Sequence, residues 1–256
     1  MRVLLCLIIL VIAHSGCDKI PEDEPDDGCQ AFEYSDTYQY PLIPGTDEWK
    51  SYEGNRKEAC IIPEDVLATI STEGLLESLL NKPFIWTDYV AYDYRQDGFV
   101  HLMELFPGIG EFLSRPDVFS VIYDRYQKMD LDCEAYYPPL YSDVLLFGFP
   151  CIEIYMVQDE FLENLDSIEI NLLFEIIRDI NLLKIDKRPV FYLEALESTA
   201  LMGKILLKAN YAPFVDFYNA NEDISWFIEK LPWFGWDVPP RDTINAYAEG
   251  YYSLLH

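Results

Sequence analysis

The chain has 256 residues, of which 45 are acidic and 18 are lysine or arginine, so its formal net charge is −27 at pH 7. Half of the residues are hydrophobic, which excludes a disordered acidic tail, because such tails combine high charge with few apolar residues. The negative charge also excludes nucleic acid as a partner, since nucleic-acid binders neutralise phosphates with lysine and arginine. The composition therefore indicates an acidic, aromatic-rich globular protein, and it indicates no reaction.

The first segment of the chain is typical of a secretory leader. Arg2 precedes the apolar run Val3–Ala13, and the small residues Ser15 and Gly16 follow. As a helix this run would rise about 16 Å, well short of the roughly 30 Å hydrocarbon core of a bilayer, so it is too short to span a membrane. We therefore predict that residues 1–16 are a signal peptide.

Cys17 follows this leader directly. Small residues before a cysteine at the end of an apolar run resemble the lipobox of bacterial lipoproteins, in which the cysteine becomes the new N-terminus and carries acyl chains. His14 departs from the pattern, because the family usually has leucine at that position. The resemblance implies that Cys17 is lipidated. Ordinary cleavage after Gly16, which would leave an unmodified thiol, is the alternative.

Residues 17–28 form a predicted acidic tether. Six of them are acidic, two are proline and almost none is apolar, so the segment should be extended and self-repelling. The acidic run also resembles the export signal that follows the acylated cysteine in some Gram-negative surface lipoproteins, with a plain solvated linker as the alternative. We therefore expect a lipid anchor in the outer membrane of a cell envelope, on either the periplasmic face or the cell surface.

Residues 29–256 are predicted to form a single helical domain. Its first part, residues 29–61, is expected to be an extended, turn-rich lead-in whose aromatic residues pack onto the domain. Helical signals start after Pro63, and Ser71 or Thr72 is predicted to cap the next helix. Between Asp130 and Pro150 we expect a loop. Further predicted helices cover Gln96–Phe106, Pro116–Met129, Ile152 onward through Leu183, a long helix after Pro189, Asp223–Leu231 and Asp242–Leu255.

These elements predict an all-α fold, because no run of alternating apolar and polar residues indicates a strand. The number of helices and their short, proline-bearing connections favour an irregular multi-helix bundle or a short α-solenoid of helical hairpins. In the long helix after Pro189, we expect Leu193 and Ala200 to face inward, and Glu194 and Glu197 to face outward.

Four cysteines remain in the predicted domain: Cys29, Cys60, Cys133 and Cys151. An even number in an oxidising compartment allows two disulfides, in any of three connectivities. Pairing of sequence neighbours would give Cys29–Cys60 and Cys133–Cys151, and buried free thiols are the alternative. The chain has no Cys-x-x-Cys pair and few histidines, so we predict no metal site.

Motifs of catalysis are absent from the sequence. It contains no phosphate-binding loop, nucleophile elbow, zinc-protease motif or EF-hand loop, so we predict no catalytic residue and no cofactor. Acidic pairs one helical turn apart, such as Glu160 with Glu163 and Glu194 with Glu197, are expected to be exposed helix faces. A glycosidase would instead need two carboxyl groups across a cleft, with one pKa raised by burial.

The most distinctive local stretch is Leu231–Pro240, which carries Trp233, Phe234 and Trp236 between prolines. These rings could stack on sugars, anchor a partner protein, or simply close one end of the helical array. Tyr137 and Tyr141, in the loop between the two helical halves, are a second candidate for binding.

Two segments, Cys60–Leu75 and Leu196–Phe214, resemble a group of uncharacterised secreted lipoproteins of Gram-negative bacteria. The resemblance covers about residues 58–230, and it implies location and a helical fold without implying an activity. Together these observations predict a lipid-anchored cell-envelope protein that acts as a non-catalytic binding module for an unknown protein or glycan. The alternative is a carboxylate-dependent hydrolase that acts on a glycan.

Overall fold

The structure is a computed structural model that describes residues 32–83, 91–130, 148–187, 195–232 and 239–256. The chain divides into two compact units, Met1–Gln30 and Ala31–His256, and every described residue belongs to the second unit. The predicted signal peptide, Cys17 and the acidic tether therefore lie outside the described residues.

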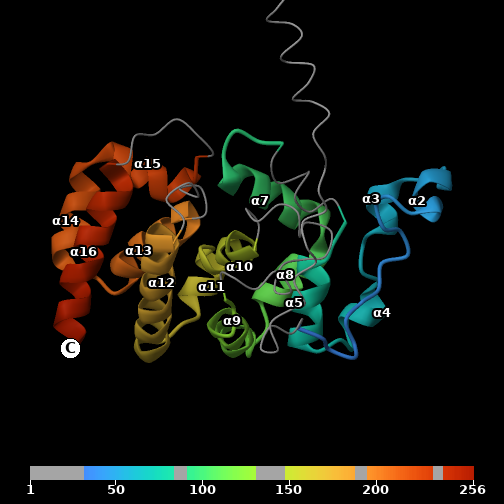
Figure 1. Cartoon of the computed structure of the whole chain (residues 1–256), viewed down its shortest axis with the longest axis horizontal. Coiled ribbons are helices and arrows are strands. Elements are labelled where there is room, and N and C mark those ends of the chain that lie inside the picture. Colours follow the sequence, from blue (N-terminus) through green and yellow to red (C-terminus); the bar gives the residue numbers. More distant parts are fainter. Residues whose placement is uncertain (1–31, 84–90, 131–147, 188–194, 233–238) are drawn as a thin grey trace, which may run out of the picture. The chain divides into compact units, whose positions relative to one another are not determined.

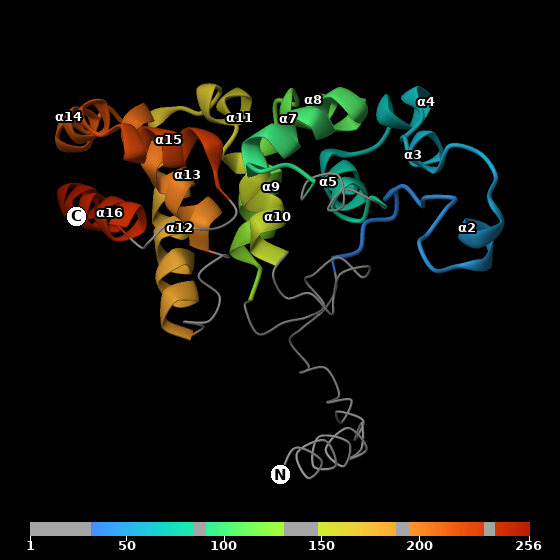
Figure 2. The ribbon, with the colours of Figure 1, turned by 90° about the horizontal axis from the view of Figure 1, so that it is seen from above.

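The described residues form helices joined by turns and contain no strand, which confirms the all-α prediction (Figures 1 and 2). A single antiparallel bridge pairs Tyr94 with Pro232. The helices are α2 (Asp47–Ser51), α3 (Arg56–Ala59), α4 (Glu64–Leu67), α5 (Thr72–Leu80), α7 (Arg95–Leu105), α8 (Pro107–Leu113), α9 (Val118–Gln127), α10 (Gly148–Met156), α11 (Asp159–Glu163), α12 (Ser167–Lys187), α13 (Ala195–Lys208), α14 (Ala212–Ala220), α15 (Glu222–Lys230) and α16 (Pro239–Leu255).

Local capping explains several helix starts. The Ser71 hydroxyl accepts a hydrogen bond from the Gly74 N–H at 3.0 Å, which confirms the predicted cap of α5. At the start of α12, the Asp166 carboxylate accepts from the Glu169 N–H at 2.9 Å, and the Glu169 carboxylate accepts from the Asp166 N–H at 2.9 Å. This reciprocal arrangement is a capping box, and it satisfies N–H groups that have no partner inside the helix.

Two predicted boundaries were wrong. The lead-in contains the short helices α2 and α3, because Thr46 and Asn55 each accept a hydrogen bond from a backbone N–H of the turn that follows. Helix α10 begins at Gly148, inside the predicted loop, and it contains Pro150. Proline is tolerated there because its missing N–H falls in the first helical turn, where no intrahelical partner exists.

Helix α13 packs against α10, α12, α14, α15 and α16. Figures 1 and 2 both show it among these neighbours. Small residues allow this close packing: Ala200 is fully buried, and a Cβ atom on Gly203 would lie 2.5 Å from Ile228 Cδ1 of α15. The side chains of α13 are buried on almost every side, so this helix has no broad polar face.

The N-terminal helices form a second packed group that shares the same core. Helix α5 packs on α8 and α9, and α7 packs on α8. Contacts of α9 with α10 and α12, and of α7 with α15, join this group to the helices around α13. Residues 32–43 add Tyr40 and Leu42 to the core, so the segment before α2 is part of the folded unit.

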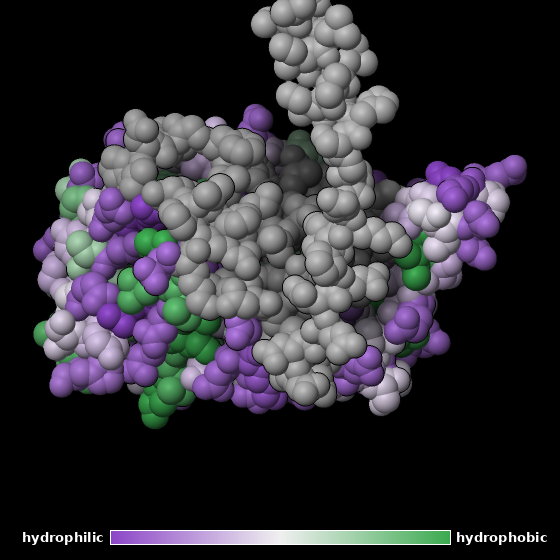
Figure 3. Space-filling view, in the orientation of Figure 1, coloured by the Kyte–Doolittle hydropathy of each residue, from purple (hydrophilic) through white to green (hydrophobic). Residues whose placement is uncertain are grey.

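Helix α12 leaves a set of large apolar side chains exposed. Ile168 is 68% exposed, and Leu172 and Leu183 are also accessible to solvent. Figure 3 shows hydrophobic surface over the part of the molecule where Figure 1 places α12. Within the described ranges, no helix combines the length and the apolar character that crossing a bilayer requires.

Candidate functional site

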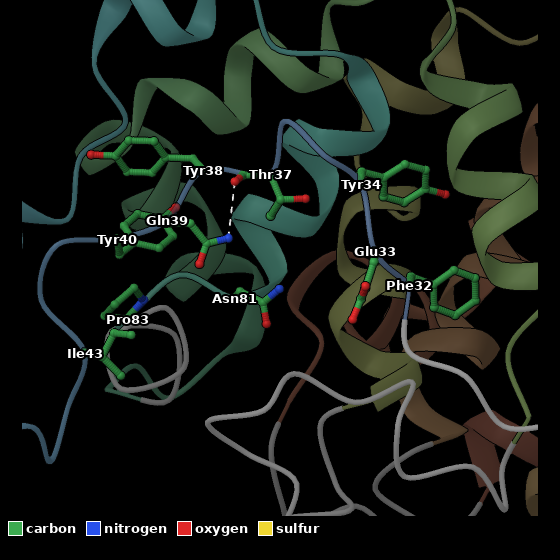
Figure 4. A pocket seen from close by; sticks show the side chains of 10 residues that line it. All are labelled: Phe32, Glu33, Tyr34, Thr37, Tyr38, Gln39, Tyr40, Ile43, Asn81 and Pro83. Atoms are coloured by element: carbon green, nitrogen blue, oxygen red, sulfur yellow. Dashed lines mark hydrogen bonds between the residues drawn. The ribbon is translucent and has the colours of Figure 1, made fainter. Parts of the chain in front are cut away.

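A pocket of about 460 Å³ lies beside the segment of residues 32–43, where the C-terminal end of α5 forms another wall (Figure 4). Its volume falls in the range of about 300–1,000 Å³ that is usual for small-molecule sites. Aromatic rings and uncharged polar groups dominate the described residues of its lining, which are Phe32, Glu33, Tyr34, Thr37, Tyr38, Gln39, Tyr40, Ile43, Asn81 and Pro83.

Hydrogen bonds at the start of α5 hold one end of this wall. The Asp36 carboxylate accepts from the Ser71 N–H at 2.7 Å and from the Ser71 hydroxyl at 3.1 Å. These bonds, the backbone one above all, hold the pKa of Asp36 below its ordinary value. Gly74 permits the approach, since a Cβ atom there would lie 2.4 Å from Asp36 Oδ1. The turn that carries Asp36 is therefore fixed to the helix cap.

Ser78 of α5 positions the two tyrosines further along the wall. Its hydroxyl accepts from the Tyr38 N–H at 2.8 Å, and its carbonyl accepts from the Tyr40 hydroxyl at 2.9 Å. The rings of Tyr38 and Tyr40 meet edge to face, with centroids 5.1 Å apart. One buried serine thus holds the backbone at Tyr38 and the ring hydroxyl of Tyr40 against α5.

Buried cations lie against two of the lining rings. The Arg125 guanidinium lies 3.5 Å from the centroid of the Phe32 ring and forms an ion pair with Glu77 at 2.6 Å. The Lys82 ammonium lies 5.5 Å from the centroid of the Tyr40 ring. Burial raises the pKa of Glu77, and Arg125 counteracts part of that rise. Positive charge therefore stands beside the pocket, although none of the described lining residues is cationic.

Two buried polar atoms of the lining have no hydrogen-bond partner among the described residues: Thr37 Oγ1 and Asn81 Oδ1. The Asn81 Nδ2 atom donates to the Glu77 carbonyl at 2.9 Å. In Figure 4, Thr37 and Asn81 lie between Gln39 on one side and Glu33 on the other. A buried polar atom without a partner costs about 1–3 kcal/mol, and both oxygens are closed to solvent, so a group in the pocket does not contact them in this structure.

Comparison with known proteins does not assign this geometry to a family. No family model, curated protein or solved structure matches the chain. The resemblance to secreted lipoproteins of Gram-negative bacteria therefore stays a prediction, and the chemistry of the pocket must be argued from its own residues.

A second constellation is buried in the core. The Glu153 carboxylate of α10 accepts from the Lys184 ammonium of α12 at 2.5 Å and from the Tyr126 hydroxyl of α9. Lys184 lies 3.3 Å from the Ser198 hydroxyl of α13. The side chains of Glu153 and Lys184 are 0% and 1% exposed. These contacts tie four helices together through one buried ion pair.

Glu197 of α13 forms a similar pair with Arg95 of α7, and both side chains are buried. The prediction that Glu197 faces outward was therefore wrong, because α13 is surrounded by other helices and a cation from α7 neutralises the carboxylate. Burial raises the pKa of Glu197, while Arg95 lowers it and nearby Glu153 raises it further. Glu160 and Glu163, in contrast, are exposed as predicted.

The buried carboxyl groups do not form an open acid–base site in the described part of the chain. Glu153 and Glu197 are not among the residues that line the pocket of Figure 4, and their side chains have almost no contact with solvent. Each keeps one carboxylate oxygen without a hydrogen-bond partner among the described residues. Ion pairing between helices is the role that this arrangement supports.

Several predicted site residues cannot be compared with the structure. Cys17 and the candidate binding residues Trp233, Phe234, Trp236, Tyr137 and Tyr141 lie outside the described residues. They remain predictions. In the residues that the structure covers, no group of three or more histidine, cysteine or acidic side chains could hold a metal ion.

The predicted disulfides are likewise not tested, because Cys29 and Cys133 lie outside the described residues. Cys60 is a buried free thiol whose Sγ lies 3.9 Å from the Leu42 carbonyl, and Cys151 is fully buried. Burial raises the pKa of both thiols, which makes them poor nucleophiles.

The residues of the pocket were not predicted as a site. The sequence carried one signal for them, since Phe32, Tyr34, Tyr38 and Tyr40 all lie at even positions, a spacing typical of extended chain with one aromatic face. Asn81 gave no such signal, because its part in the pocket depends on a segment about forty residues earlier in the chain.

Proposed function

We propose that this chain is a lipid-anchored protein of the cell envelope whose folded unit binds a ligand in the pocket of Figure 4 without transforming it. The leader, Cys17 and the acidic tether support the anchor and an outer-membrane location. The observation that carries the binding function is the concave pocket of about 460 Å³, which the aromatic side chains of Phe32, Tyr34, Tyr38 and Tyr40 line from the segment before α2.

The dimensions of the pocket favour a compact ligand, or the end of a polymer, over a protein surface. A stable protein interface buries about 1,200–2,000 Å² and is usually centred on protruding aromatic or arginine side chains. A concave site of about 460 Å³ encloses one or two ring-sized groups. Between an unknown protein and a glycan as partner, the pocket therefore supports the glycan.

The alternative function is a carboxylate-dependent hydrolase. One observation favours it: the core holds two carboxyl groups near each other, Glu153 and Glu197, and burial raises the pKa of Glu197. However, a glycosidase needs two carboxyl groups that reach the substrate, and the side chains of Glu153 and Glu197 are 0% and 1% exposed. The open pocket thus supports binding more directly than the buried pair supports hydrolysis.

The anchor is tested by replacing Cys17 with serine. We expect the wild-type chain to fractionate with membranes and to incorporate radiolabelled palmitate, and we expect the Cys17→Ser chain to be released in soluble form. Membrane association that persists in the variant would contradict lipidation at this residue.

The pocket is tested by filling it. Gln39 lines the pocket, is exposed, and donates only a 3.3 Å hydrogen bond to the Thr37 carbonyl, so Gln39→Trp should occupy the site without disturbing the core. Gln127→Trp, at an exposed position of α9, is the matched control. Each soluble variant is equilibrated with small molecules and oligosaccharides released from an envelope digest, and the retained compounds are identified by mass spectrometry.

We expect the wild-type and Gln127→Trp proteins to retain the same compounds, and the Gln39→Trp protein to lose them. Identical retention by all three proteins would refute ligand binding at this pocket.

A further inference from the structure

We infer that the solvent-exposed face of α12 is a docking surface for a cationic amphipathic helix of a partner protein. This surface is separate from the proposed ligand pocket, because none of the described pocket residues belongs to α12. Two features of the face carry the inference: a concentration of exposed apolar side chains, and carboxylates that alternate with them. In Figure 3, hydrophobic and hydrophilic surface lie beside each other where Figure 1 places α12.

Exposed apolar side chains are concentrated on α12. Of the nine large ones in the described ranges, four lie on this helix with exposed fractions between 40% and 68%: Ile168, Leu172, Leu182 and Leu183. The other five occur singly on other segments, at Ile43, Tyr52, Ile61, Val100 and Leu254. Single exposed apolar residues are normal on a protein surface, whereas a concentration of them indicates a surface that another molecule covers.

Three carboxylates lie on the same face of α12. Because successive residues of a helix are about 100° apart, the four apolar side chains and Glu175, Asp179 and Asp186 fall within an arc of about 100°. Asp179 is 67% exposed, and Asp186 is also exposed. Lys184, in contrast, is 1% exposed and lies in the core. These seven residues form a strip about 27 Å long, which we call the α12 strip, in which apolar and acidic groups alternate.

The cations beside the α12 strip do not neutralise it. Arg178 donates to Glu249 of α16 through two hydrogen bonds of 2.7 Å, and to Asp179 at 2.9 Å. Glu175 pairs with His256 at 3.2 Å, and that histidine carries charge only when it is protonated. One guanidinium that is shared between two carboxylates, with further carboxylates on the strip, leaves this surface negative. A partner that covers the strip must therefore supply positive charge.

The alternation of acidic and apolar groups decides which partner fits. A second copy would place one negative strip against another, because a two-fold interface uses the same surface of both chains. A bilayer surface is also unfavourable, since helices that lie on anionic lipid carry lysine or arginine on their polar face. A helix with leucine and lysine at helical spacing fits both features, because its apolar side chains pack on those of the strip while its cations meet the carboxylates.

The probe is a synthetic peptide of leucine and lysine with helical spacing, about 18 residues long so that it follows the whole strip. A peptide of the same composition in shuffled order carries the same charge without an apolar face, and a peptide with glutamate in place of lysine keeps the apolar face. Binding of each labelled peptide to the soluble Cys17→Ser chain is measured by fluorescence anisotropy. We expect the leucine–lysine helix to bind at least about tenfold more tightly than either comparison peptide.

The apolar contribution is tested with Leu172→Gln and Leu183→Gln in one chain. Both side chains are exposed, so the fold should be retained, and circular dichroism checks this. Val100→Gln of α7 is the control, because Val100 is as exposed as Leu183, at 44%. We expect the double variant to weaken binding of the leucine–lysine helix about tenfold, and Val100→Gln to change it by less than about twofold.

The acidic contribution is tested at constant net charge. Glu175→Gln with Asp186→Asn removes two carboxylates from the strip, whereas Asp47→Asn with Glu104→Gln removes two that are 97% and 72% exposed on α2 and α7. Both double variants reduce the negative charge of the chain equally. We expect the first to weaken binding about fivefold and the second to change it by less than about twofold.

Four results would overturn the inference. Equal affinity for the helical and the shuffled peptide, or equal weakening by the two charge variants, would show only general attraction to a chain of net charge −27. Dimers in sedimentation velocity that Leu172→Gln with Leu183→Gln abolishes would assign the strip to a second copy. Binding to phosphatidylglycerol vesicles that the same variant abolishes would assign it to lipid. None of these results bears on the ligand pocket, which Gln39→Trp tests separately.

Discussion

The ion pair between Lys184 and Glu153 allows a quantitative test of the described core. Its Nζ–Oε1 distance is 2.5 Å, and the two side chains are 1% and 0% exposed. Lys184→Met keeps an unbranched side chain, one atom shorter, and leaves the Glu153 carboxylate buried with the hydrogen bond from Tyr126 but without the Lys184 ammonium. Removing one partner of a buried pair costs about 3–5 kcal/mol, against a total stability of about 5–15 kcal/mol for a typical domain. We therefore expect a large loss of the free energy of unfolding.

A double-mutant cycle distinguishes the interaction energy of the Lys184–Glu153 pair from the effect of each single substitution. Glu153→Gln removes the opposite charge and still accepts a hydrogen bond from Tyr126, so the single variant should be destabilised because it takes away the carboxylate that lies 2.5 Å from the buried Lys184 ammonium. The variant that carries both changes removes both charges of the pair. Its destabilisation should be smaller than the sum of the two single effects by about 2 kcal/mol or more. The assay is urea unfolding of the soluble Cys17→Ser chain, followed by far-ultraviolet circular dichroism.

Lys50→Met is the control, because Lys50 pairs with Asp47 at 3.4 Å and both side chains are largely exposed. We expect no measurable change in its unfolding midpoint. The reasoning fails if Lys184→Met is as harmless as Lys50→Met, or if the two core changes prove additive.

Three further predictions concern other parts of the fold. Gly203→Ala should destabilise the fold by about 1–3 kcal/mol, because its Cβ would lie 2.5 Å from the buried Ile228 side chain. The control is Gly110→Ala in α8, which should be neutral or stabilising because a Cβ there would have nothing within 4 Å. Thermal unfolding distinguishes the two variants. Burial raises the pKa of Glu197 above its ordinary 4.5, so the folded state binds that proton more tightly and stability falls as pH rises from 4.5 through the raised pKa. Glu197→Gln should flatten this part of the urea-midpoint profile, and an unchanged slope would contradict the assignment. Ser71→Ala should cost about 1 kcal/mol in the same unfolding assay, since it removes the cap of α5, and a change within error would contradict the capping role.

The sequence predicted those features of the fold that depend on neighbouring residues. The cap at Ser71 and the proline before α4 are local signals, because each concerns N–H groups within one helical turn. Helical periodicity likewise predicted the all-α class. Where a boundary was missed, as at the start of α10, the competing signal was also local: Pro150 indicated a loop, and the structure places it in the first turn of a helix.

The sequence could not predict features that depend on distant partners. Helical periodicity placed Glu197 on a polar face, so it was expected to be exposed. Periodicity cannot show that Arg95, about a hundred residues earlier, supplies the opposite charge. The pocket likewise depends on contacts between residues that are distant in the sequence. Asn81 becomes a lining residue only because Ser71 and Ser78 hold residues 36–40 against α5, and no local pattern encodes that contact.

The separation of charges between the core and the surface has a consequence for the behaviour of the protein in salt. In the described residues, the acidic side chains of Glu77, Glu153 and Glu197 are buried beside cations, whereas the other acidic side chains are half-buried or exposed. Ions at 0.1 M screen exposed charges beyond about 10 Å but do not reach the buried pairs. A rise in ionic strength should therefore relieve repulsion within a chain of net charge −27 and leave its internal pairs intact, so that the fold tolerates saline surroundings better than dilute buffer.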